Sequence, residues 1–139
     1  MTRYLLLTYK VPRTPSAKRV AVWRKLRKLG ALQIQDSAWV LPVMERTAEA
    51  LQWLAAEIKE MGGDYSLWEA EMLAEGQAQS LQQRFKTQVD DAYQEILRAL
   101  TEPEANRSSL ARRWQELQAI DFFNSELGRR VQKALLSAK

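Results

Sequence analysis

Residues 4–41, YLLLTYKVPRTPSAKRVAVWRKLRKLGALQIQDSAWVL, decide the fold of this 139-residue chain. Tyr4–Tyr9 is short, apolar and aromatic and is followed by prolines, which is typical of a buried central strand. A helix follows to about residue 29 and ends at Gly30, because glycine readily adopts the left-handed conformation beyond a helix. Residues 31–41 hold two short apolar segments around Gln-Asp, which predicts a hairpin.

A second helix and a fourth strand complete this half of the chain. Apolar residues at helical spacing predict a helix from Thr47 to Gly62, and residues 65–73 predict a strand. The expected buried face of that helix is Leu51, Leu54, Ala55 and Ile58. The order over residues 1–75 is therefore β-α-β-β-α-β, an α+β domain with the ferredoxin-like split βαβ arrangement. Helices cover one face of such a sheet, so we expect the other face to meet a partner or the rest of the chain.

The remaining residues keep a helical period. We expect residues 76–139 to form an all-helical C-terminal extension of about three helices, interrupted by a loop at residues 101–109 and packed on the first domain. Asp121 is expected to cap the last helix, because a carboxylate satisfies the free N–H groups of a first turn.

Charge is unevenly distributed along the chain. The first 35 residues hold nine Lys and Arg and no acid, whereas residues 36–76 hold nine acids and two bases. A strongly basic end attracts polyanions, nucleic acid first among them, although phosphate contacts do not choose DNA over RNA. The alternative is that the basic segment neutralises the acidic middle of the same domain. The candidate nucleic-acid-binding residues are Lys10, Arg13, Lys18, Arg19, Arg24, Lys25, Arg27 and Lys28.

Three tryptophans admit two interpretations. Aromatic rings beside a basic surface can stack bases, which would make Trp23, Trp39 and Trp68 a platform for nucleic acid. However, Trp23 lies on the apolar stripe of the first helix, and the other two lie in predicted strands. The sequence therefore favours core positions for all three.

The chain contains no Cys and no His. Their absence removes the thiolate nucleophile, the commonest general base and the commonest ligands for zinc, copper and iron. We therefore expect no enzymatic activity, no cofactor and no metal site. No apolar run approaches the length of about 18 residues that a membrane span needs, and the N-terminal apolar stretch is too short for a secretory signal. We expect a cytoplasmic protein without a membrane partner.

Several stretches resemble the N-terminal domain of the chromate-resistance protein ChrB family. Besides residues 4–42, they are QWLAAEIKEMGGDYSLWEAEML at 52–73, FKTQVDDAYQEIL at 85–97 and AIDFFNSELGRRVQKALL at 119–136. The resemblance implies a bacterial DNA-binding repressor of chromate-efflux genes that releases DNA when chromate is present. Longer members of that family carry a second, C-terminal domain tied to the chromate response, which we do not expect here because the sequence ends at Lys139. The most specific matching motifs are Trp23-Arg24, Leu29-Gly30-Ala31, Val40-Leu41-Pro42 and Asp121-Phe122-Phe123.

Residues 1–75 also resemble the ferredoxin-like domain of CRISPR-associated integration proteins and of phenylacetate-type (PaaX) repressors. In the CRISPR family, an acid after the tyrosine of the first strand is tied to metal-dependent nuclease activity. The matching position here is Lys10, whose cation repels magnesium and cannot ligate it. This departure argues against a nuclease and leaves a dimeric scaffold that binds nucleic acid.

The charge pattern predicts nucleic-acid binding, and the resemblance implies a transcriptional regulator of chromate-resistance genes. DNA, a second copy of the chain, and chromate or another oxyanion as effector are the expected partners. The alternative is a non-enzymatic interaction module whose basic surface docks an acidic partner or a separate chromate-responsive domain.

Overall fold

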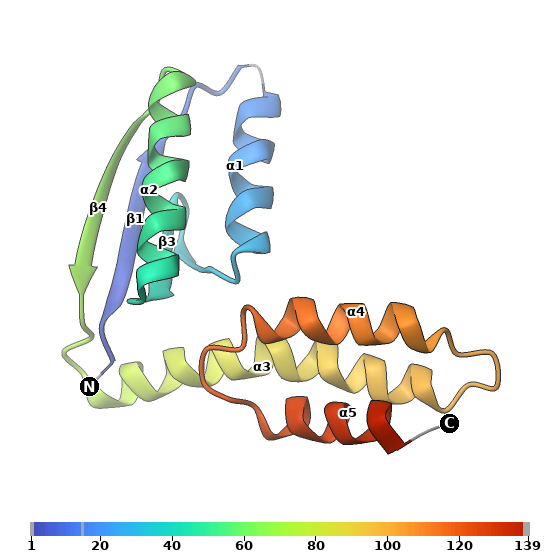
Figure 1. The fold of residues 1–139 in the computed structure, drawn as a ribbon. Helices are drawn as coiled ribbons and strands as arrows, with labels where there is room; N and C mark the ends of the chain where they lie inside the picture. The colour runs from blue at the N-terminus through green and yellow to red at the C-terminus, as the bar shows by residue number, and fades with distance from the viewer. Residues whose placement is uncertain (1, 15, 138–139) are drawn as a thin grey trace. The chain divides into compact units, whose positions relative to one another are not determined.

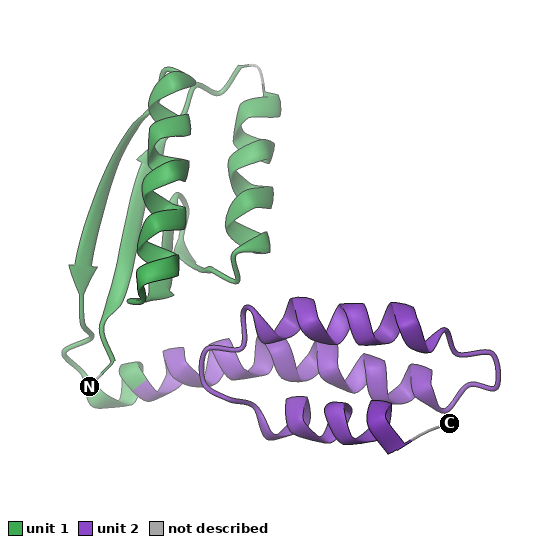
Figure 2. Cartoon of the chain, in the orientation of Figure 1, with its two compact units in different colours: residues 1–78 green, residues 79–139 purple. Residues whose placement is uncertain are grey.

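The structure, a computed structural model, describes residues 2–14 and 16–137. In that part the chain forms a four-stranded antiparallel sheet and five helices, which confirms the α+β class. The chain divides into two compact units, residues 1–78 and 79–139 (Figure 2). The domain boundary expected after residue 75 falls at the start of one long helix, which begins in the first unit and continues in the second. Packing of the helical extension on the first domain stays a prediction.

The first unit has the predicted order of strands and helices (Figure 1). Its elements are β1 (Tyr4–Lys10), α1 (Ser16–Lys28), β2 (Leu32–Gln35), β3 (Ala38–Pro42), α2 (Glu45–Glu60) and β4 (Asp64–Ala70). The strands lie in the order β2-β3-β1-β4, and each neighbouring pair is antiparallel. Leu7 at the middle of β1 pairs with Trp39 on one side and with Leu67 on the other. Both helices lie on the same side of the sheet (Figure 1).

The core of the first unit draws on the central strands and on both helices. Leu7 and Leu41 are fully buried, as are Val22 and Leu26 of α1. Burying a side chain of this size contributes about 1.5–3 kcal/mol, so these few residues hold the helices to the sheet. The predicted buried face of α2 is confirmed, since Leu51, Leu54, Ala55 and Ile58 are all buried.

Glycines end both helices of this unit, as the sequence predicts. Gly30 and Gly62 have φ values of 83° and 86°, in the left-handed region. Beyond α1, the Ala31 N–H donates to the Leu26 carbonyl at 3.1 Å, and beyond α2 the Gly63 N–H donates to the Ile58 carbonyl at 2.9 Å. These bonds satisfy carbonyls that the end of a helix leaves free.

Helix α2 begins at Glu45, two residues before the position near Thr47 at which the sequence predicts its start. The Thr47 hydroxyl works from within the first turn. It accepts from the Met44 N–H at 2.9 Å and lies 2.7 Å from the Pro42 carbonyl, to which it donates. Threonine often marks the residue before a helix, but here it secures the first turn from inside.

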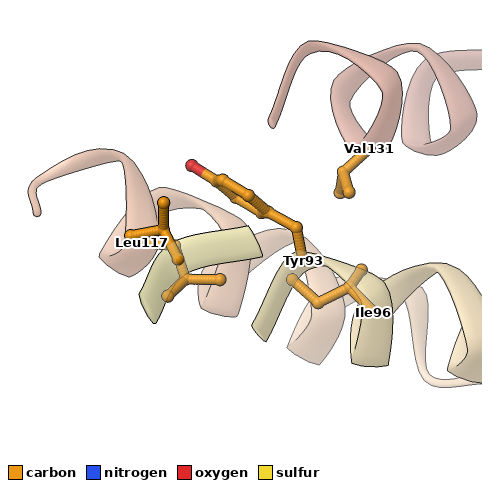
Figure 3. Close-up of a cluster of buried hydrophobic side chains, with 5 residues drawn as sticks. Tyr93, Ile96, Leu117 and Val131 are labelled. Atoms are coloured by element: carbon orange, nitrogen blue, oxygen red, sulfur yellow. The ribbon is translucent and has the colours of Figure 1, made fainter. Parts of the chain in front are cut away.

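The second unit consists of three helices, α3 (Glu75–Leu100), α4 (Arg107–Gln118) and α5 (Glu126–Ser137). All three contribute to one hydrophobic core, whose fully buried members include Tyr93 and Val131 (Figure 3). Asn106 caps α4, because its side chain accepts from the Ser109 N–H at 3.0 Å.

Asp121 does not cap the last helix, contrary to the sequence prediction. Helix α5 begins at Glu126, and Ser125 stands directly before it, with its hydroxyl accepting from the Gly128 N–H at 3.4 Å. The Asp121 carboxylate instead accepts from the Ser125 N–H and from the Tyr93 hydroxyl, both at 2.9 Å. Phe122 and Phe123, which lie between Asp121 and Ser125, pack their rings against that of Phe85, at centroid distances of 5.8 and 5.9 Å. Because these residues form a turn, α5 begins after Ser125 and not after Asp121.

Candidate nucleic-acid interface

The eight predicted contact residues lie on one continuous segment. Lys10 ends β1, Arg13 lies in the connecting loop, and the other six are on α1. Seven of the eight are exposed, and Lys18 is partly buried. Val22 and Leu26 are the buried residues of α1, and at 100° per residue the bases occupy the remaining arc of the helix. The six bases of α1 therefore share one helix but not one face.

Two of these bases hold α1 to α2. The Lys18 ammonium donates to the Met61 carbonyl at the end of α2, at 3.0 Å. Lys25 forms an ion pair with Glu57 in the middle of α2. Both contacts are explained by packing within the unit, so these two residues have a structural role whatever else they bind.

Arg27 is engaged by an aromatic ring. Its guanidinium carbon lies 5.5 Å from the centroid of the Trp23 ring, one turn earlier on α1. A cation over an indole at this distance is attracted by the negative face of the ring, by about 0.5–1 kcal/mol at an exposed site. This contact leaves the charge of Arg27 uncompensated.

Five predicted residues keep free cationic groups. Within residues 2–14 and 16–137, Lys25 is the one member of the eight that has a carboxylate within 4.0 Å. Neutralisation by the acidic middle of the domain therefore accounts for one residue of the set. The exposed bases with neither a carboxylate nor an aromatic partner are Lys10, Arg13, Arg19, Arg24 and Lys28.

A pocket of about 590 Å³ opens between α1 and the strand ends beside it. Lys10, Arg13 and Arg19 give it three cations, and Tyr9 and Trp23 give it aromatic walls. Burial raises the pKa of the Tyr9 phenol, while the nearby positive charge of Arg19 acts against that rise. The phenol is therefore neutral near pH 7 and can both donate and accept a hydrogen bond.

The hairpin of β2 and β3 supplies the other lining of this pocket. Gln33, Asp36 and Ser37 line it, so the pocket contains a carboxylate as well as cations. The hairpin is fixed beside the end of β1, because the Tyr9 N–H donates to the Ser37 carbonyl at 3.0 Å. The Lys and Arg residues can be identified from the sequence, but their position beside this hairpin cannot.

The prediction that three tryptophans are core residues is right for one of them. Trp39 is 2% exposed, but Trp23 is 46% and Trp68 is 58% exposed. The buried arc of α1 is narrow and centred on Val22 and Leu26, which leaves Trp23 at its edge. Trp68 belongs to the edge strand β4, where it follows the partly buried Leu67 and so projects from the opposite face of the sheet.

Within the described residues there is neither a cluster of metal ligands nor a helix that could span a membrane. No group of three or more Asp and Glu side chains in residues 2–14 and 16–137 is placed to hold a metal ion. In the same part of the chain, every helix is too short or too polar to cross a membrane.

The fold and this surface define a small α+β protein with a basic helix and an adjoining pocket lined by three cations. Residues 19–108 match the family described as Protein ChrB, N-terminal, so the chain belongs to that family, as its sequence motifs predict. It is 27% identical to Protein ChrB of Cupriavidus metallidurans over 143 aligned residues, which cover 94% of this chain and 44% of that protein. The chain thus spans less than half the length of this relative. No solved structure matches it.

Proposed function

We propose that this chain is a DNA-binding transcriptional regulator of chromate-resistance genes, with a ferredoxin-like first unit that holds DNA phosphates through α1 and the end of β1. In this proposal the protein has no enzymatic activity and is cytoplasmic. One observation carries it: within the described residues, five exposed bases on this segment have neither a carboxylate nor an aromatic partner. Lys and Arg contacts to phosphates supply affinity without reading the sequence.

The outer face of α1 is the part suited to a duplex. Arg24, Arg27 and Lys28 project away from the buried arc of the helix, where a phosphate backbone has access. Lys10 and Arg13 extend the same charge to the end of β1. Each neutralised phosphate releases counterions, so five contacts predict a slope of about −4 to −5 for log K against log salt.

Family membership supports the chromate context, and an anionic effector is part of our proposal. Chromate is a tetrahedral dianion, and basic side chains that bind phosphate also suit this anion. In our proposal chromate competes with DNA for the bases around Arg13 and Arg19, which lowers the affinity for the operator. This competition links the presence of the anion to release of DNA.

The proposed regulator is a homodimer formed through the sheet face opposite the helices. Trp68 is 58% exposed on that face, beside the partly buried Leu6 with which it pairs in the sheet. A large aromatic residue is enriched at protein interfaces because it buries much area at small entropic cost. A dimer would double the basic surface available to the two halves of a palindromic site.

Fluorescence anisotropy with labelled duplex DNA, titrated at several salt concentrations, tests the phosphate grip. We expect salt-sensitive binding that the double substitution Arg24→Gln/Lys28→Gln weakens at every duplex sequence. Arg112→Gln/Arg113→Gln, which removes two exposed bases of α4, is the matched control. Absence of binding at low salt, or binding that salt does not weaken, contradicts the proposal.

A protein-interaction module is the second candidate. The Lys25–Glu57 ion pair favours it, because it shows the basic helix already bonded to a carboxylate of this chain. An acidic partner, or a separate chromate-responsive domain, would extend that contact along α1. Co-purification of such a partner through the native chain, lost with Arg24→Gln/Lys28→Gln and without any duplex binding, would favour the module over the regulator.

A further inference from the structure

The pocket beside Trp23 is lined by aromatic, amide and carboxylate groups as well as cations, and phosphate binding alone requires only the cations. We propose that it binds one nucleotide unit, with the aromatic base against Trp23 and the phosphate on Lys10, Arg13 and Arg19. The inference rests on the proposed function for its nucleic-acid ligand and names the part of that ligand which enters the protein. A free mononucleotide has the same chemistry and is the second source that the experiment distinguishes.

The size of the pocket fits a ligand larger than a simple anion. Its volume of about 590 Å³ lies within the range of about 300–1,000 Å³ that is typical of small-molecule sites. A tetrahedral oxyanion fills only a small part of this space. A ligand that carries a second group beside the anion would occupy more of it.

The cations of the pocket are available to a phosphate. Lys10, Arg13 and Arg19 come from β1, the following loop and α1, and all three side chains are exposed. In the described part of the chain none of them has a carboxylate within ion-pair distance. Three unpaired bases around one cavity match the double negative charge of a terminal phosphate.

The aromatic wall supplies the second recognition element. Trp23 lines the pocket and is 46% exposed, although it lies at the edge of the apolar stripe of α1. Arg27 lies 5.5 Å from the ring centroid and restrains the indole from the outer side of the helix. Every base has a π face, so an exposed and restrained indole beside phosphate-binding cations suits base stacking.

The carboxylate in the pocket argues against a bare oxyanion as the full ligand. Asp36 would repel chromate or phosphate placed beside it, whereas it can accept from the N–H groups on the edge of a base. Gln33 also lines the pocket and can both donate and accept. A pocket lined by cations and by hydrogen-bond acceptors fits a ligand with an anionic end and a base.

The base must be unpaired to use this pocket. Inside a duplex both faces of a base are covered by its neighbours, so it cannot also stack on Trp23 unless it leaves the helix. The pocket is therefore suited to a single-stranded segment, a strand end or an extruded nucleotide. The outer face of α1 meets the duplex, and the pocket takes the unpaired unit.

Isothermal titration calorimetry of the full chain with deoxyadenosine 5′-monophosphate, deoxyadenosine, inorganic phosphate and chromate tests the pocket. Anisotropy with a short single-stranded oligonucleotide and with a duplex completes the set of probes. The variants are Trp23→Ala, Trp23→Phe and Arg13→Gln/Arg19→Gln. Trp53→Ala is the control, because Trp53 on α2 is 69% exposed and does not line this pocket. Circular dichroism confirms that each variant folds.

We expect the mononucleotide to bind at least about tenfold more tightly than inorganic phosphate, because stacking adds to the phosphate contact. Trp23→Ala should lower affinity for the single strand about tenfold, Trp23→Phe should retain most of it, and Trp53→Ala should not change it. If Trp23→Ala weakens binding of both the mononucleotide and the single-stranded oligonucleotide, the pocket is a general nucleotide site. If it weakens binding of the oligonucleotide alone, the ligand of the pocket is a nucleotide within a strand.

Two results overturn the inference. One is phosphate or chromate binding as tightly as the mononucleotide, and the other is an equal effect of Trp23→Ala and Trp53→Ala on both ligands. Duplex binding that is salt-sensitive and lost with Arg24→Gln/Lys28→Gln, but indifferent to Trp23, would leave the proposed function standing while this inference fails. Mononucleotide binding that depends on Trp23, without any duplex binding, would support this inference and contradict the proposed function.

Discussion

Gly128 of α5 packs so closely on Tyr93 of α3 that a Cβ atom at position 128 would lie 2.9 Å from the Tyr93 Cζ atom. The ring has no freedom to move away. Its hydroxyl donates to Asp121 at 2.9 Å and accepts from Gln118 at 2.7 Å. The backbone of α5 is fixed as well, since the Trp114 indole N–H donates to the Gly128 carbonyl at 2.8 Å. One close contact thus joins the three helices of the second unit.

Gly128→Ala should destabilise the protein. Overpacking against a locked ring costs about 1–3 kcal/mol, and the better helix propensity of alanine offsets up to about 1 kcal/mol of that. Gly76→Ala is the matched control, because a Cβ there meets nothing within 4 Å. The free energies of unfolding from denaturant titration should therefore differ between the two variants, with Gly128→Ala the less stable. Equal stabilities would show that the Tyr93 ring yields without cost.

Tyr93→Phe should destabilise the protein by about 1–3 kcal/mol, because Asp121 and Gln118 both lose a partner. The substitution should also change the pH dependence. Burial, and then the hydrogen bond and charge of Asp121, raise the pKa of Tyr93 above its usual 10.0. A raised pKa of this acid adds stability that is complete below pH 10.0 and is lost as pH rises beyond it.

Unfolding titrations of the native chain and of Tyr93→Phe at pH values from 8 to 11 check this sign. The native chain should lose stability above about pH 10, by up to about 1.4 kcal/mol per pH unit for one proton. Tyr4 and Tyr9 also have raised pKa values and remain in the variant, so the difference between the two curves isolates Tyr93. Parallel curves would contradict the assignment.

Local features of the sequence predict the architecture well, and the site less well. Gly30 and Gly62 end helices because left-handed backbone is a local property of glycine, readable without any neighbour. The exposure of Trp23 depends instead on how wide an arc of α1 the sheet covers. The pocket depends on Asp36 returning beside the end of β1, a contact between segments distant in the sequence. Helical and strand periods carry no information about that approach.

Lys18 and Arg24 should separate structural from binding roles on α1. Lys18→Ala removes the bond to the Met61 carbonyl and should lower stability by about 1 kcal/mol, since that bond joins α1 to the end of α2. Arg24→Ala removes an exposed side chain without an ion pair and should leave the thermal midpoint unchanged. In duplex binding the order should reverse, with the larger loss for Arg24→Ala. Thermal melts and anisotropy on the same preparations measure the loss of stability and the loss of duplex affinity in the two variants. If the same variant showed the larger loss in both experiments, the separation of structural and binding roles would be refuted.

Glu57→Gln should strengthen duplex binding. Its carboxylate pairs with Lys25. Within the described residues it is the one carboxylate within 4.0 Å of any of the eight candidate contact residues. Removing its charge frees Lys25 for a phosphate and removes a repulsion, so the salt slope should steepen by about 0.9. Stability should change by less than about 1 kcal/mol, because the pair is partly exposed. Glu116→Gln on α4 makes the same change in net charge within the second unit and controls for it. An equal gain from both variants would mean that net charge, and not the freed Lys25, governs binding, whereas a gain confined to Glu57→Gln places the phosphate contact on α1.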